Sequence, residues 1–200
     1  KTNAWSGMIK WNPCVEYVEE YTLPEAYRAS DYFSTDTAEN GPWACRYYTP
    51  TDGYRNMNNL CSWVSGFGDD TASQGSAWIQ KSLDDGFAAL SVSVGKYYMC
   101  PERNDAGKYD PNIATRAVRT FTVPYTGKIS VTADDGNGKS RILGSSKTKN
   151  GAYVRIMYNG RMVWPNTSNL NGERVTGGDG TNVGDINAAP LKLEVKKGDK

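Results

Sequence analysis

Seven residues at three places in the sequence combine an arginine with an aromatic ring in a way that could bind a ligand. They are Arg46, Tyr48 and Tyr54; Arg155 and Trp164; and Arg103 and Tyr109. Exposed Tyr and Trp rings stack on the flat C–H faces of sugar rings, while neighbouring polar groups hydrogen-bond the hydroxyls. We therefore treat these seven residues as candidate ligand-binding residues for a carbohydrate.

The strand expected at residues 42–48 suggests which side chains of the first group face outward. Arg46 and Tyr48 share one face of that strand, and Cys45 lies on the other face. If the face that carries Cys45 is buried, Arg46 and Tyr48 point to solvent. Tyr54 then lies at the tip of the following turn, where side chains are usually exposed.

Each of these groups has a purely structural alternative, which the sequence leaves open. The tryptophans could all pack in the core. Arg155 and Trp164 could form a structural cation–π pair at a sheet edge. The loop of residues 102–110, which carries Arg103 and Tyr109, could be a solvated connector.

Two oxygen-rich loops are candidates for a structural Ca²⁺ site, the one cofactor that the sequence suggests. The candidate ligands are Asp134, Asp135 and Asn137 in the first loop and Asp179 and Asp185 in the second. Carboxylate and amide oxygens are the ligands that Ca²⁺ prefers. Neither loop has the closing Glu of an EF-hand, and Asp-Gly and Asn-Gly also form ordinary turns.

Catalysis is not expected from the residues present. The chain has no histidine, which excludes Ser-His-Asp and Cys-His mechanisms and His-ligated zinc or haem. A glycosidase needs two carboxylates across a groove, but the glutamates are scattered and form no Glu-x-Asp-x-x-Glu or Glu-x-Asp-x-Glu strand pattern. A jelly-roll polysaccharide lyase or glycosidase is therefore only a lesser alternative.

Four cysteines without C-x-x-C spacing argue against a zinc or redox motif and leave disulfides or free thiols. A hairpin centred near Asp52-Gly53 places Cys45 opposite Cys61, at a separation that a disulfide can close. Cys14 and Cys100 then pair by default. Four reduced, buried thiols are the alternative.

The clearest signals of secondary structure lie in residues 116–165. Residues 116–122 alternate with the period of a strand, and Asn159-Gly160 between two apolar runs predicts a type I′ hairpin. This two-residue loop fixes the cross-strand pairs. They are Tyr158 with Arg161, Met157 with Met162, Ile156 with Val163, and Arg155 with Trp164.

Further strands are expected at residues 78–83, 88–98 and 191–195, with no convincing amphipathic helix. The β-branched and aromatic residues of 15–22 also favour a strand, with one helical turn as the alternative. This pattern predicts an all-β fold, an antiparallel β-sandwich of jelly-roll-like form. The length fits a single domain over residues 1–200, with residues 1–25 as an N-terminal segment that packs on it.

The two ends of the sequence suggest a piece of a longer, multidomain protein. Lys1 is preceded by neither an initiator Met nor a signal peptide. The chain closes with a strand and a turn, so either a last strand lies beyond residue 200 or the sheet closes without one.

Composition and charge narrow the possible partners. The formal net charge is +1, from 23 basic and 22 acidic residues without a dense basic cluster, so no nucleic-acid partner is expected. No apolar run approaches the roughly 20 residues of a membrane-spanning helix, so no membrane insertion is expected either.

An ordered set of short motifs resembles one family. The motifs are Arg28 to Ser34, Asn40-Gly41-Pro42-Trp43 with Tyr47-Tyr48, Tyr98 to Pro101, Ala117 to Phe121 with Gly127, Val154-Arg155-Ile156 with Asn159-Gly160, Val163-Trp164-Pro165, and Lys197-Gly198-Asp199. In this order they resemble the β-sandwich accessory modules of bacterial extracellular glycoside hydrolases and polysaccharide lyases. The resemblance covers roughly residues 26–200. It departs at Cys100, where a His would precede Pro101, and at Asn150, where an Asp would precede Gly151, so no role is transferred to either position.

The resemblance implies a secreted or cell-surface, non-catalytic carbohydrate-binding module. Its partners would be a polysaccharide or oligosaccharide and the neighbouring domains of the same chain. The module would target an attached polysaccharide-degrading enzyme to its glycan. The main alternative is a structural or adhesion β-sandwich of a cell-surface protein that binds protein or glycan. Because acidic and basic residues are nearly equal in number, the sequence does not favour a neutral or an acidic glycan.

Overall fold

A computed structural model describes residues 9–10, 12–17, 26–61, 76–80, 92–100, 115–134, 143–144, 152–165, 172–175 and 191–200. Every regular element in these ranges is a β-strand, and all strand pairs are antiparallel. The predicted all-β class is therefore confirmed, and the set of antiparallel sheets is consistent with a β-sandwich.

The strands form three larger sheets and two pairs. The first sheet has the order β13 (Leu143–Gly144), β1 (Ile9–Lys10), β10 (Tyr98–Cys100), β9 (Ser93–Gly95), β8 (Ala77–Ile79), β7 (Asn59–Cys61). The second has the order β11 (Arg116–Phe121), β5 (Trp43–Thr49), β4 (Glu39–Asn40), and β6 (Gly53–Asn56) also pairs with β5. The third has the order β18 (Leu191–Val195), β12 (Gly127–Asp134), β2 (Asn12–Tyr17), β3 (Tyr27–Arg28). The two pairs are β14 (Ala152–Val154) with β17 (Glu173–Val175), and β15 (Ile156–Tyr158) with β16 (Arg161–Trp164).

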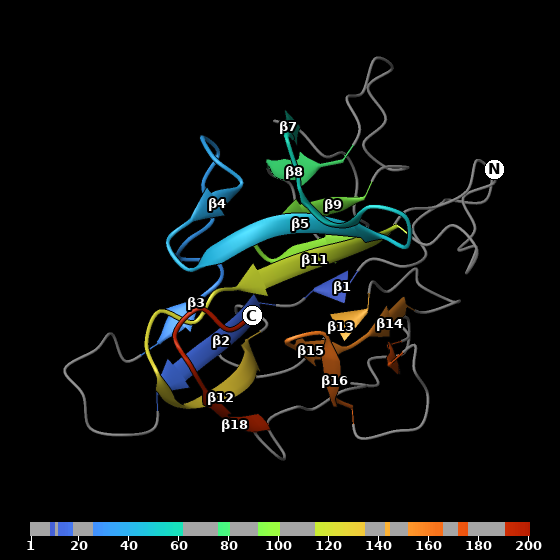
Figure 1. Ribbon diagram of the computed structural model, residues 1–200. Helices are drawn as coiled ribbons and strands as arrows, with labels where there is room; N and C mark the ends of the chain where they lie inside the picture. The colour runs from blue at the N-terminus through green and yellow to red at the C-terminus, as the bar shows by residue number, and fades with distance from the viewer. Residues whose placement is uncertain are drawn as a thin grey trace.

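The sheet that contains β5 and β11 runs across the middle of the molecule (Figure 1). In that view β7, β8 and β9 lie above it, and β2, β12, β18 and the β15–β16 hairpin lie below it. The C-terminus lies between β11 and the lower strands. Residues of both β11 and β15 line the candidate site.

Two clusters of buried apolar side chains hold these layers together. One contains Met57, Trp78, Val92, Val94, Met99 and Val154. The other contains Val15, Ala29, Trp43, Val123, Ile129, Val131 and Val195. Ile156 packs against both clusters, so the β15–β16 hairpin is fixed to the two cores at once.

The N-terminal segment supplies integral strands, although the sequence suggested only that it packs on the domain. β2 lies between β12 and β3, with Val15 opposite both Val131 and Tyr27. The buried Asn12 side chain donates to Ser30 Oγ at 2.8 Å and accepts from the Ser30 backbone N–H at 2.9 Å. These two hydrogen bonds satisfy the buried Asn12 amide and so avoid the free-energy cost of burying an unpaired polar group.

The predicted Cys45–Cys61 disulfide is not formed, because the hairpin turn lies about two residues earlier than expected. Thr49 pairs with Gly53 and Tyr48 with Tyr54. Thr49 Oγ1 accepts the Asp52 N–H at 2.9 Å, and Pro50 supplies the fixed φ that favours a turn. Cys45 therefore accepts a backbone bond from Met57, while Cys61 lies in β7 of another sheet.

Cys14, Cys45 and Cys61 are all free thiols. Because Cys14 is free, the predicted Cys14–Cys100 bridge is also wrong. That bridge followed only from the Cys45–Cys61 pairing, which the hairpin register removes.

The β15–β16 hairpin forms where predicted but with a shifted register. Asn159 and Gly160 have φ values of 47° and 84°, the positive values that a type I′ turn requires. Tyr158 pairs with Arg161 and Met157 with Met162, as expected, but a bulge then places Trp164 opposite Ile156. The predicted Arg155–Trp164 pair is therefore wrong.

The strand expected over residues 88–98 is also corrected in its described part. β9 and β10 form an antiparallel pair in which Met99 lies opposite Val94. The chain reverses between them at Lys96 and Tyr97. The strands expected at residues 116–122 and 191–195 are found as β11 and β18.

Candidate functional site

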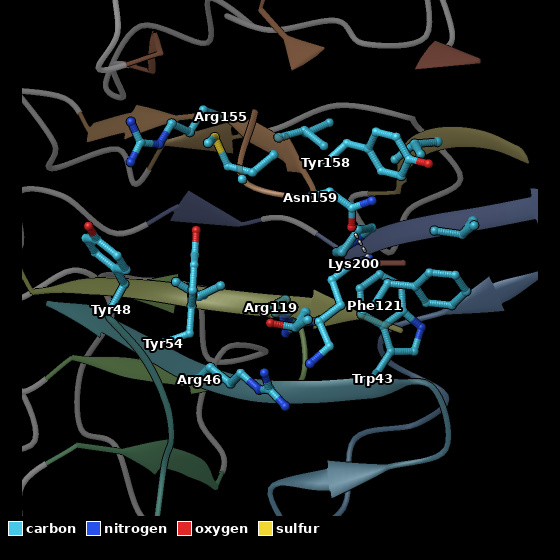
Figure 2. A pocket seen from close by; sticks show the side chains of 18 of the residues that line it. Trp43, Arg46, Tyr48, Tyr54, Arg119, Phe121, Arg155, Tyr158, Asn159 and Lys200 are labelled. Atoms are coloured by element: carbon cyan, nitrogen blue, oxygen red, sulfur yellow. Dashed lines mark hydrogen bonds between the residues drawn. The ribbon is translucent and has the colours of Figure 1, made fainter. Parts of the chain in front are cut away.

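A cavity of about 770 Å³ separates the β5–β11 sheet from the β15–β16 hairpin and from β12 and β18. Figure 2 shows Tyr48 and Tyr54 projecting from one wall toward Arg155 on the other. Lys200 lies between the two walls, and Trp43 and Phe121 lie together at one end. The volume falls in the range of about 300–1,000 Å³ that is usual for small-molecule sites.

The first wall contains all three residues of the first predicted group, Arg46, Tyr48 and Tyr54. Tyr48 and Tyr54 are cross-strand neighbours, and their ring centroids are 5.0 Å apart with a tilt of 55°. Tyr54 is 48% exposed, so one ring of the pair is open to a ligand. The three residues therefore lie on one wall of the same cavity, and their role in binding a ligand stays a prediction.

Arg116 joins this wall, although the sequence did not single it out. It lies opposite Tyr48 on β11, with its guanidinium carbon 5.4 Å from the centroid of the Tyr48 ring. This is a cation–π distance. The sequence showed the strand but not its partner, because a pair some seventy residues apart leaves no local signal.

Arg46 is held in place by an ion pair at the rim. Its Nη2 lies 2.7 Å from Glu39 Oε1, and this hydrogen bond lowers the pKa of Glu39 below its ordinary value. The register of β4 on β5 brings Glu39 next to Arg46, since Glu39 lies opposite Ala44. Arg46 Nε is buried and has no hydrogen-bond partner in the described structure.

Arg119 is a second arginine that sequence reasoning missed. It lies opposite Cys45 and donates through Nη2 to the backbone carbonyls of Gly95 and, at 2.8 Å, Lys96. Burial lowers its pKa to about 10. Strand alternation marks Arg119 as belonging to the face opposite Arg116 but cannot show that this face is covered by β9 and β10.

The opposite wall contributes Tyr153, Arg155 and Tyr158. Tyr153 is 41% exposed. Tyr158 donates its hydroxyl hydrogen bond to Asp199 Oδ2 at 2.5 Å, and this bond raises the pKa of Tyr158 and lowers that of Asp199. Of the second predicted group, Arg155 lines this cavity together with the first group, but Trp164 does not. Trp164 packs against the cluster formed by Met57 and its neighbours and is not among the lining residues.

The remaining predicted residues lie largely outside the described part of the chain. These are Arg103, Tyr109, Asp135, Asn137, Asp179 and Asp185. Asp134 ends β12, where its backbone pairs with Asn12. Within the described residues no cluster of three or more His, Cys, Asp or Glu side chains could hold a metal ion, and calcium stays a prediction of the sequence.

Comparisons with protein families, curated proteins and solved structures found no match for this chain. The described residues also include no helix long and apolar enough to cross a membrane.

Proposed function

We propose that this chain is a non-catalytic carbohydrate-binding module. The observation that carries the proposal is the ring pair of Tyr48 and Tyr54 at the cavity, flanked by the guanidinium groups of Arg116 and Arg46. One ring is half exposed. A sugar ring would stack on Tyr54, and the arginines beside it would donate hydrogen bonds to hydroxyl or carboxylate oxygens.

Two further features support binding rather than hydrolysis. Among the described residues that line the cavity there is no Asp or Glu, and glycoside hydrolysis by the common mechanism needs a pair of carboxylates. The second wall adds Tyr153, a further exposed ring. The groups at hand are therefore of the kind that hold a sugar rather than cleave its bonds.

We infer that the preferred glycan is acidic. The charged side chains in the described lining are all basic, namely Arg46, Arg116, Arg155 and Lys200, together with Arg119, whose guanidinium is directed at the carbonyls of Gly95 and Lys96. The carboxylate of Glu39 forms an ion pair with one of them, Arg46, at the rim. Arginine recognises carboxylates through two parallel N–H donors, so a uronate-containing polymer suits this site better than a neutral one.

The setting that we propose is a larger secreted or cell-surface protein that acts on polysaccharides. Holding the glycan near an attached enzyme raises the effective concentration of the glycan at the active site, without any new contact there. Free thiols are uncommon in secreted proteins. Burial shields Cys14 from oxidants, whereas the partly exposed Cys61 would be open to them in this setting.

Affinity electrophoresis against soluble neutral and acidic polysaccharides tests the proposal. We expect at least one acidic polymer to retard the chain, with no reducing sugar or unsaturated product released. Release of product would make the chain an enzyme, and absence of retardation by every polymer would remove the carbohydrate assignment.

A further inference from the structure

The cavity is bordered by the edges of two strands, as its lining shows. Every residue from Thr115 to Phe121 lines it, and so does every residue from Tyr153 to Gly160. A strand that presents only a face to a cavity contributes every second residue, because side chains alternate. The first run contains β11, and the second contains β15 (Ile156–Tyr158) with the residues on either side of it. Because consecutive residues of each strand line the cavity, both strands turn their backbone edges toward the same space.

The register of β11 identifies the backbone groups on its outer edge. Thr122 donates to the Pro42 carbonyl on the β5 side at 2.8 Å, in line with the pairing of Phe121 and Trp43. In an antiparallel ladder bonding alternates along the strand, so the even-numbered residues point their N–H and C=O groups at β5. Ala117, Arg119 and Phe121 then point theirs away from β5, and no described strand pairs with that edge.

β15 offers a second edge of the same kind across the cavity. Its described pairing is with β16 alone. Unpaired strand edges are templates on which another strand can add.

One end of the gap between these edges is already bridged by backbone. Val123, just after β11, donates to the Asp199 carbonyl at 2.9 Å and accepts from the Gly198 N–H at 2.8 Å. Asn159, in the β15–β16 turn, donates to the Lys200 carbonyl at 2.7 Å. An extended segment can therefore lie between β11 and β15, since residues 198–200 do so at the end of the gap (Figure 1).

The floor of the gap is apolar. Ile129 and Val131 of β12 and Val195 of β18 line the cavity and are at most 7% exposed. An added strand would bury every second side chain against them. Its polar ends would meet Arg116 and Lys200, which also line the cavity.

We propose that an extended segment of a partner protein adds as a strand between β11 and β15. Its chemistry is apolar side chains at alternate positions with acidic residues at the ends, over about the six residues of β11. The added strand would join β4, β5 and β11 to β15 and β16 in one continuous sheet. A lipid or glycan would fill space but could not pair with the repeating backbone groups of both edges. The inference does not rest on the proposed carbohydrate function, because the strand would pair with the backbone edges of β11 and β15, whereas a sugar would be held by side chains of the same cavity. A bound strand and a bound sugar would therefore compete for this space.

Amide hydrogen exchange with a synthetic peptide tests this site in the intact chain. The probe is acetyl-Glu-Thr-Val-Thr-Val-Thr-Val-Glu-amide, and the control replaces the second and third of its three threonines with proline, which cannot donate. At about ten times the dissociation constant of the probe, exchange at Ala117, Arg119 and Phe121 should slow about tenfold. Val118 and Thr120, already directed at β5, should not change, and the proline control should not bind.

Equal protection of neighbouring amides, or no binding of the probe, would overturn the proposal. The same alternating protection in the chain alone, with sedimentation that shows a dimer, would overturn it too, because the occupant would then be a second copy.

Variants of one edge residue give an independent readout. Ala117→Pro removes an outward N–H but none of the bonds to β5, and proline is tolerated on edge strands. We expect it to bind the probe at least about fivefold more weakly than Ala117→Ser, which keeps the N–H. Equal binding by both folded variants would contradict strand addition. If Ala117→Pro does not fold, the exchange pattern of the unmodified chain still decides.

Discussion

At the scale of single residues, Tyr54 is the side chain on which the proposed function depends most directly. Its side chain is nearly half exposed, and its ring packs against the ring of Tyr48. Replacing it by Ala removes one stacking surface worth about 1 kcal/mol, so affinity for a retained glycan should fall about fivefold. The melting temperature should change little, since truncation of an exposed side chain usually alters the free energy of unfolding by less than about 0.5 kcal/mol.

A matched control for Tyr54 is available in the same chain. Tyr125 is 46% exposed but is not among the residues that line the cavity. Tyr125→Ala should leave glycan affinity unchanged in the same electrophoresis. Equal losses in both variants would show that the effect is not local to the cavity.

The cysteines give a second prediction at the residue scale. Burial raises the pKa of Cys14 to about 11, with a further contribution from the charge of Glu16, and burial also raises that of Cys45 to about 11. At pH 8 roughly one in a thousand of each is then a thiolate, the reactive form. We expect Ellman's reagent to react quickly with the partly exposed Cys61 in the native chain and slowly with Cys14 and Cys45.

The same reagent counts the thiols after unfolding. In urea without reductant it should find at least three thiols per chain, because Cys14, Cys45 and Cys61 are free. Finding none would restore the two disulfides that the sequence suggested and would place the β5–β6 turn elsewhere.

Sequence reasoning found part of the site at this scale. Arg46, Tyr48 and Tyr54 could be predicted because strand alternation and a nearby turn are local properties. Arg116, Arg119 and Tyr153 could not, since each reaches the cavity through a partner or a layer distant in the sequence. For Trp164, a single bulge in β15 was enough to change its neighbours.

At the scale of elements, the accuracy of each turn prediction depended on how completely local chemistry determines the turn. Asn159-Gly160 needs positive φ at two successive positions, which few other residue pairs tolerate, and the turn lies where predicted. The β5–β6 turn contains both Pro50-Thr51 and Asp52-Gly53, and either of these two pairs could form the centre of a turn. The Thr49–Asp52 hydrogen bonds place it at the earlier position.

Asp199 fixes the last turn of the chain to the β15–β16 hairpin, and this contact should depend on pH. Its carboxylate accepts from Tyr158 Oη at 2.5 Å, from Asn159 Nδ2 at 3.0 Å and from the Lys196 N–H at 2.7 Å. These bonds, the one from Tyr158 first, hold its pKa below the ordinary value of 3.8. The unfolded chain therefore binds the proton more readily. The stabilisation is complete above the ordinary pKa and is lost as the pH falls through the lowered one.

Thermal unfolding between pH 2 and pH 7 checks this prediction. Asp199→Asn should melt at a lower temperature than the unmodified chain at pH 7, and the gap should narrow toward pH 2. Asp36→Asn, at an exposed position away from this turn, is the control and should show no such convergence. If the difference in melting temperature did not change with pH, the charge of Asp199 would not contribute to stability.

At the scale of the whole molecule, the sequence predicted the class of fold but not how its layers stack. Alternation and turn residues suffice for an all-β chain. The order of the sheets is a matter of long-range pairing, such as β2 with β12 or β11 with β5. The cavity arises at this level, because Ile156 fixes the hairpin to both cores while β11 and β15 remain apart.

The charge of the cavity differs from that of the whole chain, and this leads to a prediction about salt. With a net charge of +1, the chain has little long-range attraction for a polyanion. The described charged lining is nevertheless basic throughout, so attraction should act only at short range. Polygalacturonate should retard the chain more than its methyl ester, which keeps the sugar backbone and loses the charge. The difference should shrink between about 0.1 M and 1 M NaCl, as the Debye length falls from about 10 Å to about 3 Å.

Two arginine variants locate this effect within the molecule. Arg116→Gln removes the guanidinium over Tyr48 and should reduce both the retardation by polygalacturonate and its dependence on salt. Arg161→Gln, at an exposed position that does not line the cavity, changes the net charge equally and should do neither. Equal retardation by the acid and its ester at every salt concentration would contradict an acidic glycan, while the stacking role of Tyr54 would still stand on its own test.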